Sequence, residues 1–315
     1  MTTLIEKTAG LLAFVRSVET GSFSSAARSL GATPSAISKS VAKLEARLGA
    51  RLLHRSTRSI SLTDEGASYY ERVTHLVREL EEAEDAVLGS TLPRGGLRVS
   101  APIDLGRLVL AKLAGRFIER FPSVRVELLL TDRNVDLVRE GVDVAVRVGP
   151  LADSALMART IGHVEFAACA APSYLRAHGA PISLEDLARH ECLRYLSGGQ
   201  PLDWEFVDGG ARKTVTVSGS FDTDDGGALV AATLSGGGIA RVFRFQVEAH
   251  FASGELVPVL ERFGSPSLDV YALHAYSRHV SPRVRAWIDF LREHFSSQET
   301  LVVSPKGHPA NSGLG

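Results

Sequence analysis

Residues 22–48 read SFSSAARSLGATPSAISKSVAKLEARL, and this stretch decides the fold of the amino-terminal part of the chain. Its apolar positions recur at helical spacing twice, over residues 25–30 and from residue 34 onward. Gly31 lies between the two segments and suits the tight turn that ends the first helix. A short helix, a short turn and a second helix in this order predict a helix-turn-helix.

Residues at the boundaries of the two segments support this prediction. Ser22 or Ser24 can accept a hydrogen bond from the first turn of the first helix, and Thr33 can do the same for the second. Pro34 then occupies the first helical position, where its missing N–H is not needed. A further helix is predicted before them, over residues 4–20, from its apolar face.

The second helix of the motif has two chemically different faces. Its apolar residues form the inner face, and its outer face is small, polar and basic: Ser35, Ser38, Lys39 and Lys43. Serine can donate to or accept from a base edge, and lysine can donate to guanine or to a phosphate. The outer face therefore suits the major groove of DNA. The alternative is a three-helix core whose polar face only meets water.

Two short strands are predicted after the motif, over residues 51–55 and 59–62. The connection between them makes a small wing that carries Arg55 and Arg58. These arginines are expected to contact phosphates or to enter the neighbouring minor groove.

A long helix is predicted from Thr63 onward, with Thr63 as its cap and with Asp64 and Glu65 in its first turn. Apolar residues recur along it at alternating spacings of four and three, which is a heptad pattern. They are Tyr69, Val73, Leu76, Leu80, Ala83 and Val87. We expect this stripe to pack on the same helix of a second subunit; docking on the chain's own body is the alternative.

Charge is distributed unevenly along a chain whose formal net charge is only −1. Residues 1–62 carry nine Lys or Arg against three Glu, whereas residues 63–90 carry two Arg against eight Asp or Glu. A basic module joined to a nearly neutral body favours a polyanionic partner, and nucleic acid is the usual one. A solvated basic face without a partner would give the same count.

Residues 23–45, together with Leu48-Gly49, Leu52-Leu53, Arg55 and residues 62–66, resemble the amino-terminal signature of LysR-type transcriptional regulators. The match is ordered and continuous over about forty residues. The resemblance implies a winged helix-turn-helix in which Ser35, Ser38 and Lys39 face DNA. Lys39 stands where the family usually has arginine, and Ser40 where it often has glutamine.

The rest of the chain alternates short apolar strands with amphipathic helices after a linker at residues 92–96, which predicts an α/β body with mainly parallel sheets. The predicted strands are 97–101, 124–130, 142–148, 164–170, 214–217, 239–243 and 270–275. The predicted helices are 106–121, 135–140, 173–178, 183–190, 227–234, 244–252 and 282–295. Residues 296–315 are polar and are expected to be disordered.

The order of these elements is similar to the effector domain of the same family, which resembles a type-2 periplasmic binding protein with two α/β lobes. Chain crossings between the lobes are expected near residues 163–165 and 264–268. The predicted division is a DNA-binding domain (1–63), a dimerisation helix (64–90), lobe I (91–163 and 268–295), lobe II (164–267) and the tail (296–315).

A cleft between such lobes is a natural ligand site, because strands end and helices begin around it. The residues expected to hold an effector are Ser100, Ile103, Arg147, Thr223, Asp224 and Val242. Arg147 could pair with a carboxylate, or it could form an ordinary surface ion pair. Asp224 and Asp225 would repel an anion, which leaves room for an effector with an amine or a hydroxyl group.

The sequence lacks a phosphate-binding glycine loop, a dinucleotide fingerprint, a zinc-protease helix and a nucleophile elbow, so we expect neither an enzyme nor a cofactor or metal. Cys169 and Cys192 lie in apolar segments and are expected to be core thiols. Without a signal peptide or a membrane-spanning run, the chain is expected in the cytoplasm.

The expected function is a DNA-binding transcriptional regulator, a homodimer or homotetramer, whose promoter binding responds to a small-molecule effector. RNA polymerase is a possible partner. The alternative is a solute receptor of periplasmic-binding-protein type without a DNA function, which would need export.

Overall fold

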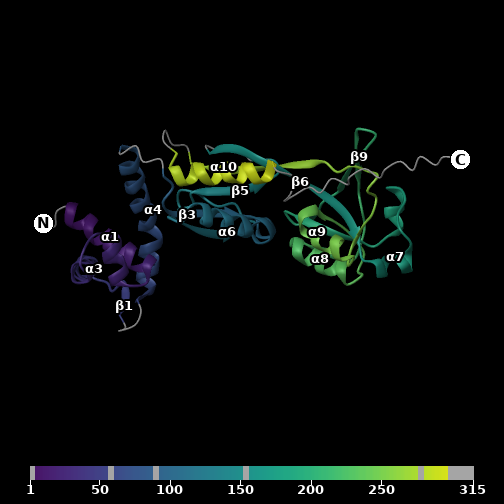
Figure 1. Cartoon of the computed structure of the whole chain (residues 1–315). Helices are drawn as coiled ribbons and strands as arrows, with labels where there is room; N and C mark the ends of the chain where they lie inside the picture. The colour runs from purple at the N-terminus through teal and green to yellow at the C-terminus, as the bar shows by residue number, and fades with distance from the viewer. Residues whose placement is uncertain (1–3, 56–59, 88–91, 152–155, 276–279, 297–315) are drawn as a thin grey trace.

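The computed structural model describes residues 4–55, 60–87, 92–151, 156–275 and 280–296. Three parts follow one another along the molecule: a helical amino-terminal domain, lobe I and lobe II (Figure 1). Within these residues, no helix is both long enough and apolar enough to cross a bilayer. The tail beyond residue 296, predicted to be disordered, lies outside them.

The amino-terminal domain contains the predicted helix-turn-helix. Its helices are α1 (Leu4–Thr20), α2 (Phe23–Ser29) and α3 (Pro34–Leu48). The predicted caps are confirmed: Ser22 Oγ accepts a hydrogen bond from the N–H of Ser25 at 3.1 Å, and Thr33 Oγ1 accepts one from the N–H of Ala36 at 3.2 Å. Gly31 has a φ of +61°, the left-handed conformation that the turn requires.

The predicted wing follows α3 as an antiparallel pair of strands, β1 (Leu53–Arg55) and β2 (Ile60–Leu62). The carboxylate of Glu45 accepts hydrogen bonds from the N–H groups of Leu52 and Leu53, at 2.9 and 3.1 Å. This side chain ties the start of the wing to α3. Residues 56–59, and with them the predicted contact residue Arg58, lie outside the described residues.

The long helix α4 (Asp64–Val87) begins as predicted, with Thr63 Oγ1 accepting a hydrogen bond from the N–H of Gly66 at 2.9 Å. Its first half packs on α1: the ring of Tyr69 lies 5.7 Å from the ring of Phe14, and Val73 is buried in the same core. Val77, which is not part of the predicted heptad stripe, is also buried there.

The interpretation of the heptad stripe as one continuous partner-facing seam is therefore wrong for Tyr69 and Val73. Both take part in the hydrophobic core of their own domain, as the alternative had it. Leu76 and Leu80 are 49% and 41% exposed. The side chains of Ala83 and Val87 lie outside the described residues. A heptad period identifies an apolar face but not which body covers it.

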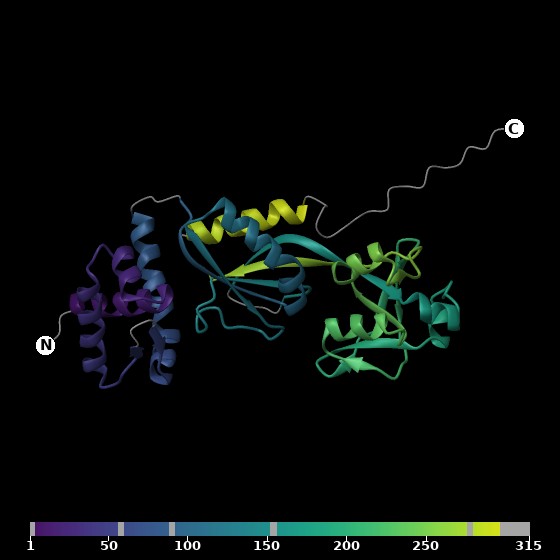
Figure 2. The same cartoon turned by 60° about the horizontal axis from the view of Figure 1, so that its bottom comes forward.

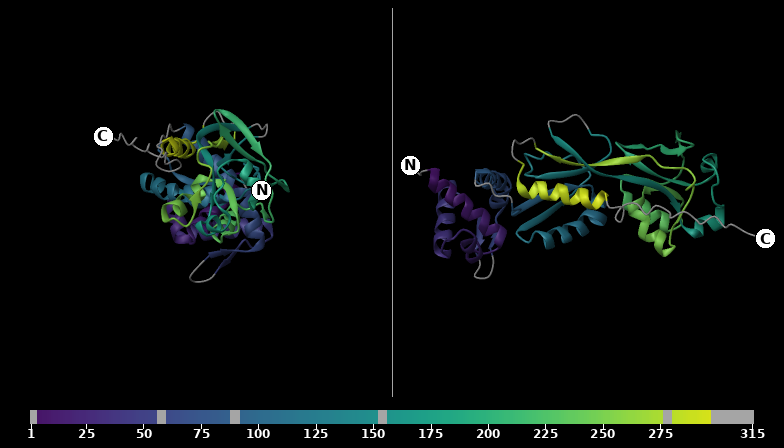
Figure 3. Two further views of the ribbon diagram at one scale, coloured as in Figure 1. Left: turned by 90° about the vertical axis from the view of Figure 1, so that its right-hand side faces the viewer. Right: turned by 45° about the horizontal axis from the view of Figure 1, so that its top comes forward.

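Lobe I places helices against a sheet and has the largest aromatic core of the chain's described part. Its strands are β3 (Gly95–Ala101), β4 (Val124–Leu130) and β5 (Val144–Val148), and its helices are α5 (Ile103–Leu105), η1 (Gly106–Leu110), α6 (Ala111–Arg120) and α10 (Pro282–Ser296). α6 and α10 pack together (Figure 3), with the rings of Phe117 and Trp287 at 4.9 Å.

Lobe II is built from the chain between residues 171 and 266. Its strands are β7 (Cys192–Ser197), β8 (Gln200–Pro201), β9 (Trp204–Asp208), β10 (Ala211–Val215), β11 (Asp222–Thr223), β12 (Ile239–Phe243) and β13 (Val257–Pro258). Its helices are α7 (Pro172–His178), η2 (Glu185–Arg189), α8 (Gly226–Leu234) and α9 (Arg244–Ser253).

Two long antiparallel strands, β6 (Met157–Ala170) and β14 (Ser267–His274), connect the lobes (Figure 2). Where the chain crossings were expected, Val164 pairs with Leu268 and Glu165 with Ser267. These strands join both lobes into one path of strands, β11-β7-β12-β6-β14-β5-β3-β4.

The prediction of mainly parallel sheets is wrong, because the sheet is mixed. The parallel pairs all lie within one lobe: β3–β4, β3–β5, β7–β12 and β7–β11. Lobe II also contains two antiparallel pairs, β7–β8 and β9–β10. The pairs that involve a crossing strand are antiparallel, namely β6–β14, β5–β14, β6–β12 and β6–β13. A chain that leaves a lobe and returns to it must run in both directions along the same sheet.

Two local predictions also fail. Residues 135–140 do not form the predicted helix: the turn over residues 137–141 ends at Gly141, which has a φ of +62°. The hairpin of β9 and β10 was predicted only in its second strand. Its signal was present in the sequence, since Gly209 and Gly210, with φ of +57° and +85°, supply the two-residue turn.

We predict that Gly66→Ala destabilises the amino-terminal domain by about 1–3 kcal/mol, because the new methyl group would overlap the backbone carbonyl of Leu52. Gly115→Ala is the control: this exposed helical position has open space around it, so alanine should raise stability by about 0.5–1 kcal/mol. Differential scanning calorimetry checks both changes. Equal stability of the two variants would contradict the close packing of α4 against Leu52, the residue before β1.

Candidate functional site

The outer face of α3 is the candidate DNA-contacting surface. Ile37, Val41 and Leu44 are buried on the inner face of this helix. On the outer face Ser35, Lys39 and Lys43 are exposed and Ser38 is half-buried. Neither lysine forms an ion pair with another described residue. The helix thus presents short and basic side chains near its amino end, where base edges are within reach.

The wing is less completely described than α3. Arg55 is the last residue of β1, but its side chain lies outside the described residues, as does the whole of Arg58. Their expected phosphate contacts stay predictions.

A cavity of about 770 Å³ lies between the two lobes. Lobe I contributes the end of β5 and the start of α5, and lobe II contributes β12, the start of α8 and part of β9. Phe166 and Leu268 line it from the crossing strands. Its volume falls in the range of sites for small molecules, and its wall is mainly apolar with a few polar groups, which is typical of such sites.

Three of the six predicted effector residues line this cavity: Ile103, Arg147 and Val242. Ser100 does not line it. It is fully buried beneath Arg147, and its Oγ accepts a hydrogen bond from Arg147 Nη2 at 3.0 Å.

Thr223 and Asp224 do not line the cavity either; the next residue, Asp225, does. Asp225 caps α8, with its carboxylate accepting a hydrogen bond from the N–H of Ala228 at 2.6 Å. Asp225 therefore lines the cavity at the amino end of α8. The sequence therefore predicted the right loop, but the residue that lines the cavity is Asp225, one position after Asp224.

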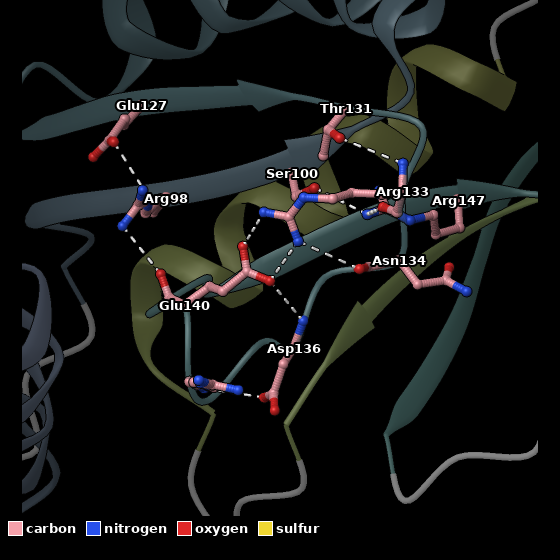
Figure 4. Close-up of polar contacts among 10 residues, drawn as sticks. Arg98, Ser100, Glu127, Thr131, Arg133, Asn134, Asp136, Glu140 and Arg147 are labelled. Atoms are coloured by element: carbon pink, nitrogen blue, oxygen red, sulfur yellow. Dashed lines mark hydrogen bonds and ion pairs between the residues drawn. The ribbon is translucent and has the colours of Figure 1, made fainter.

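Arg147 is held in place by acceptors of lobe I (Figure 4). Nη1 donates to the carbonyl of Val146 at 2.7 Å, and Nη2 donates to Ser100 Oγ and, at 3.3 Å, to the carbonyl of Arg133. No described carboxylate forms an ion pair with Arg147. The alternative role of Arg147, an ordinary surface ion pair, is therefore not what the structure shows. Burial lowers the pKa of the Arg147 guanidinium, and nearby Asp132 partly opposes this shift.

The loop after β4 is fastened by a second arginine. Arg133 Nη1 donates to Glu140 Oε1 at 2.7 Å, and the same oxygen accepts from the N–H of Asp136 at 3.0 Å. The hydrogen bond from Arg133 is the main cause that lowers the pKa of Glu140 to about 2. Figure 4 shows how this pair holds the carbonyl of Arg133 against Arg147.

The lobes touch directly at the edge of the cavity. Gln246 Nε2 on α9 donates to Asp104 Oδ2 in lobe I at 2.6 Å, and Gln246 Oε1 accepts from the N–H of Phe243 at 2.9 Å. Arg107 pairs with the other oxygen of Asp104 at 2.6 Å. Gly226 lies so close to both side chains that a Cβ there would overlap Gln246.

Sequence reasoning missed Gln246 and Gly226 and did not select Asp104. The partners come from segments about 140 residues apart, and no local spacing reports such a contact. Cys169 and Cys192 are buried, as expected of core thiols, and burial raises the pKa of each to about 12.

Comparison with known families covers both halves of the chain. The family described as "Bacterial regulatory helix-turn-helix protein, lysR family" matches residues 9–67, and the "LysR substrate binding domain" matches residues 90–296. The first includes the α3 face, and the second includes the whole interlobe cavity.

Individual relatives agree over nearly the whole length. The HTH-type transcriptional regulator CrgA of Neisseria meningitidis is 38% identical, over 90% of this chain and 95% of the relative. The HTH-type transcriptional activator AaeR of Escherichia coli is 34% identical, over 92% of this chain and 94% of the relative.

Two solved structures are similar in fold. The structure of Neisseria meningitidis CrgA has a TM-score of 0.59 at 36% identity, covering 94% of this chain and 99% of that chain. Full-length AphB, a virulence activator of Vibrio cholerae, has a TM-score of 0.56 at 29% identity, covering 92% of this chain and 98% of that chain.

These matches support a regulator that binds DNA and a small-molecule effector, and not a solute receptor without a DNA function. With a winged helix-turn-helix before a two-lobed α/β domain, the chain belongs to the LysR family of bacterial transcriptional regulators.

Proposed function

We propose that the outer face of α3 reads promoter DNA and that an effector in the interlobe cavity changes this binding by changing how the lobes close. The observation that carries the proposal is the cavity itself: it is lined by both lobes, which the chain connects through β6 and β14. A ligand between two bodies that pivot on shared strands has a different affinity for their open and closed arrangements. Only such a difference lets it shift the equilibrium.

For DNA, we propose base-edge contacts from Ser35, Ser38 and Lys39, and phosphate contacts from Lys43 and from the wing arginines Arg55 and Arg58. The exposure of the α3 lysines and the shortness of the serines support this division of roles.

For the effector, we propose that Ile103, Arg147 and Val242 contact it directly and that Asp225 replaces Thr223 and Asp224 in this role. Ser100 would act through Arg147, which it holds by a hydrogen bond. We propose no cofactor and no catalysis, so the cavity would act by binding alone.

For assembly, we propose a homodimer formed through the second half of α4, and a homotetramer built from such dimers. Leu76 and Leu80 support this, because they form an exposed apolar strip on a face of α4 that its own domain does not cover. We place the assembly in the cytoplasm, where it would meet RNA polymerase at the promoter.

We predict that Lys39→Ala weakens binding to a duplex from upstream of the chain's own gene by about 5- to 100-fold, because a base or phosphate contact is lost. Fluorescence anisotropy over a salt series measures this, and specific binding should fall steeply with salt. Lys112→Ala, an exposed lysine of α6, is the control. Equal affinity of the three proteins, or equal binding to a random duplex, would contradict the role of α3.

Leu76→Glu is expected to weaken the dimer, because it places a charge in the proposed α4 seam. Sedimentation velocity at several protein concentrations should show a shift toward monomer. Ile182→Glu on lobe II, where Ile182 is 73% exposed, is the matched control. If Leu76→Glu sediments like the unchanged protein, α4 does not form the interface.

Gln246→Glu is expected to open the lobes. Its carboxylate still accepts from the N–H of Phe243, but the donor to Asp104 is lost and two carboxylates face each other. The lobe equilibrium should shift by about 1–3 kcal/mol, seen as faster hydrogen exchange around the cavity. Adding Asp104→Asn supplies a new donor and should reverse the effect; a double variant as open as the single one would show that this contact does not control closure.

A further inference from the structure

Arg241 stands on the lobe II wall of the cavity, opposite Ala168 in the pairing of β12 with β6. Its guanidinium lies 3.9 Å from the centroid of the Phe166 ring and 5.9 Å from that of Phe206. The residue is half-buried. Neither the family signature nor the sequence pattern had selected it.

Three phenylalanines continue the stack that begins at Arg241. Phe166 and Phe243 lie 4.3 Å apart and nearly parallel, and Phe243 and Phe245 follow at 5.5 Å. All three line the cavity. We call Phe166, Phe243 and Phe245 the aromatic stack. Its rings place apolar surface in the cavity wall next to a cation.

The stacking occupies the face of the Arg241 guanidinium and leaves its edge available. Hydrogen-bond donors of guanidinium point outward in its plane, so cation–π stacking and bidentate binding are compatible. The one hydrogen bond described for these donors is long, from Nη2 to Ser265 Oγ at 3.4 Å. By contrast, three acceptors of lobe I already engage Arg147.

No described carboxylate forms an ion pair with Arg241. Burial lowers the pKa of its guanidinium to about 10, and Glu205 is the acidic group that opposes this shift. A desolvated cation with unused donors is stabilised by an anion that enters the cavity.

The acidic residues of the cavity have other partners. Asp104 accepts from Gln246 and Arg107, Asp132 accepts from the N–H of Ile103 at 3.2 Å, and Asp225 caps α8. Asp203 also lines the cavity but is exposed. The carboxylates are thus largely compensated within the protein, and the Arg241 charge is not.

We propose that Arg241 is the carboxylate-recognising residue of the effector site and that the effector is a carboxylate with a flat, apolar or aromatic body. The carboxylate accepts two hydrogen bonds from the guanidinium edge, and the body lies against the aromatic stack. This inference rests on the proposed function, since it assumes that the effector occupies the interlobe cavity.

The test uses the full-length protein and a matched pair of probes, 2-naphthoate and its neutral isostere naphthalene-2-carboxamide. Isothermal titration gives the affinities, and quenching of tryptophan fluorescence locates the probe, because Trp204 lines the cavity. We expect naphthoate to bind at least about tenfold more tightly than the carboxamide, as a charge-assisted bidentate contact requires.

Variants at Arg241 then assign the contact. Arg241→Met should lower the affinity for naphthoate about tenfold or more and abolish the preference for naphthoate over the carboxamide. Arg241→Lys keeps the positive charge but cannot donate two parallel hydrogen bonds, so its affinity for naphthoate should lie between those of Arg241→Met and the unchanged protein. Arg262→Met, at an exposed arginine of lobe II, should bind like the unchanged protein. Circular dichroism melting confirms that each variant is folded.

Three outcomes would overturn the inference: no naphthoate binding at millimolar concentration, equal binding of the two probes, or unchanged affinity in Arg241→Met. The fluorescence separates this failure from failure of the proposed function. If naphthoate binds and Trp204→Phe removes the quenching, the cavity is a ligand site whatever Arg241 does. If naphthoate binds without a Trp204-dependent signal, the ligand lies elsewhere and the proposed function of the cavity fails with the inference.

Discussion

The antiparallel pairing of β6 with β14 is the constraint on which the effector domain depends. All of lobe II lies in the chain between these two strands, so the pairing brings the chain back to lobe I in register. The register shifts between Val270 and Tyr271, opposite Gly162, and α10 lies on β6 at this glycine, where a Cβ would meet the side chain of Phe295. A bulge increases local twist, and here it is covered by a helix of lobe I. The lobe I end of the crossing is therefore firmly packed.

The interlobe contact has a suitable strength for regulation. Gln246 and Asp104 exchange a hydrogen bond to a charged group, worth about 1.5–3 kcal/mol at most. A ligand whose binding free energies for the closed and the open lobes differ by a similar amount can change the balance between the two arrangements. The buried cores of the two lobes, by contrast, are large, so each lobe is expected to move as a rigid unit. Gly226 permits the close approach, since a larger residue would separate Gln246 from Asp104.

Local signals in the sequence predicted the amino-terminal domain well. Thr33, Pro34 and Ser22 act on neighbours within three residues, so their capping roles can be read from the sequence and are found in the structure. The cavity could not be read in this way. Arg241 meets Phe166 only because β12 pairs with β6, and Gln246 meets Asp104 only because the two lobes are in contact. The heptad stripe of α4 shows the same limit, since periodicity located an apolar face but not that Val73 is covered by the chain's own domain.

The position of the lobes also restricts how a signal can reach DNA. Arg125 on β4 donates to the carbonyl of Glu19 at the end of α1, at 2.9 Å, so it is lobe I that meets the amino-terminal domain. Lobe II lies at the opposite end of the molecule (Figure 1), and among the described residues no hydrogen bond joins it to that domain. In the proposed mechanism, closure would move lobe II relative to lobe I and would leave the Arg125 contact as it is. Within one subunit, the effector would then not move α3. In the proposed mechanism the motion of lobe II must be sensed by a second subunit, which makes assembly a requirement of regulation and not only of reading two DNA half-sites.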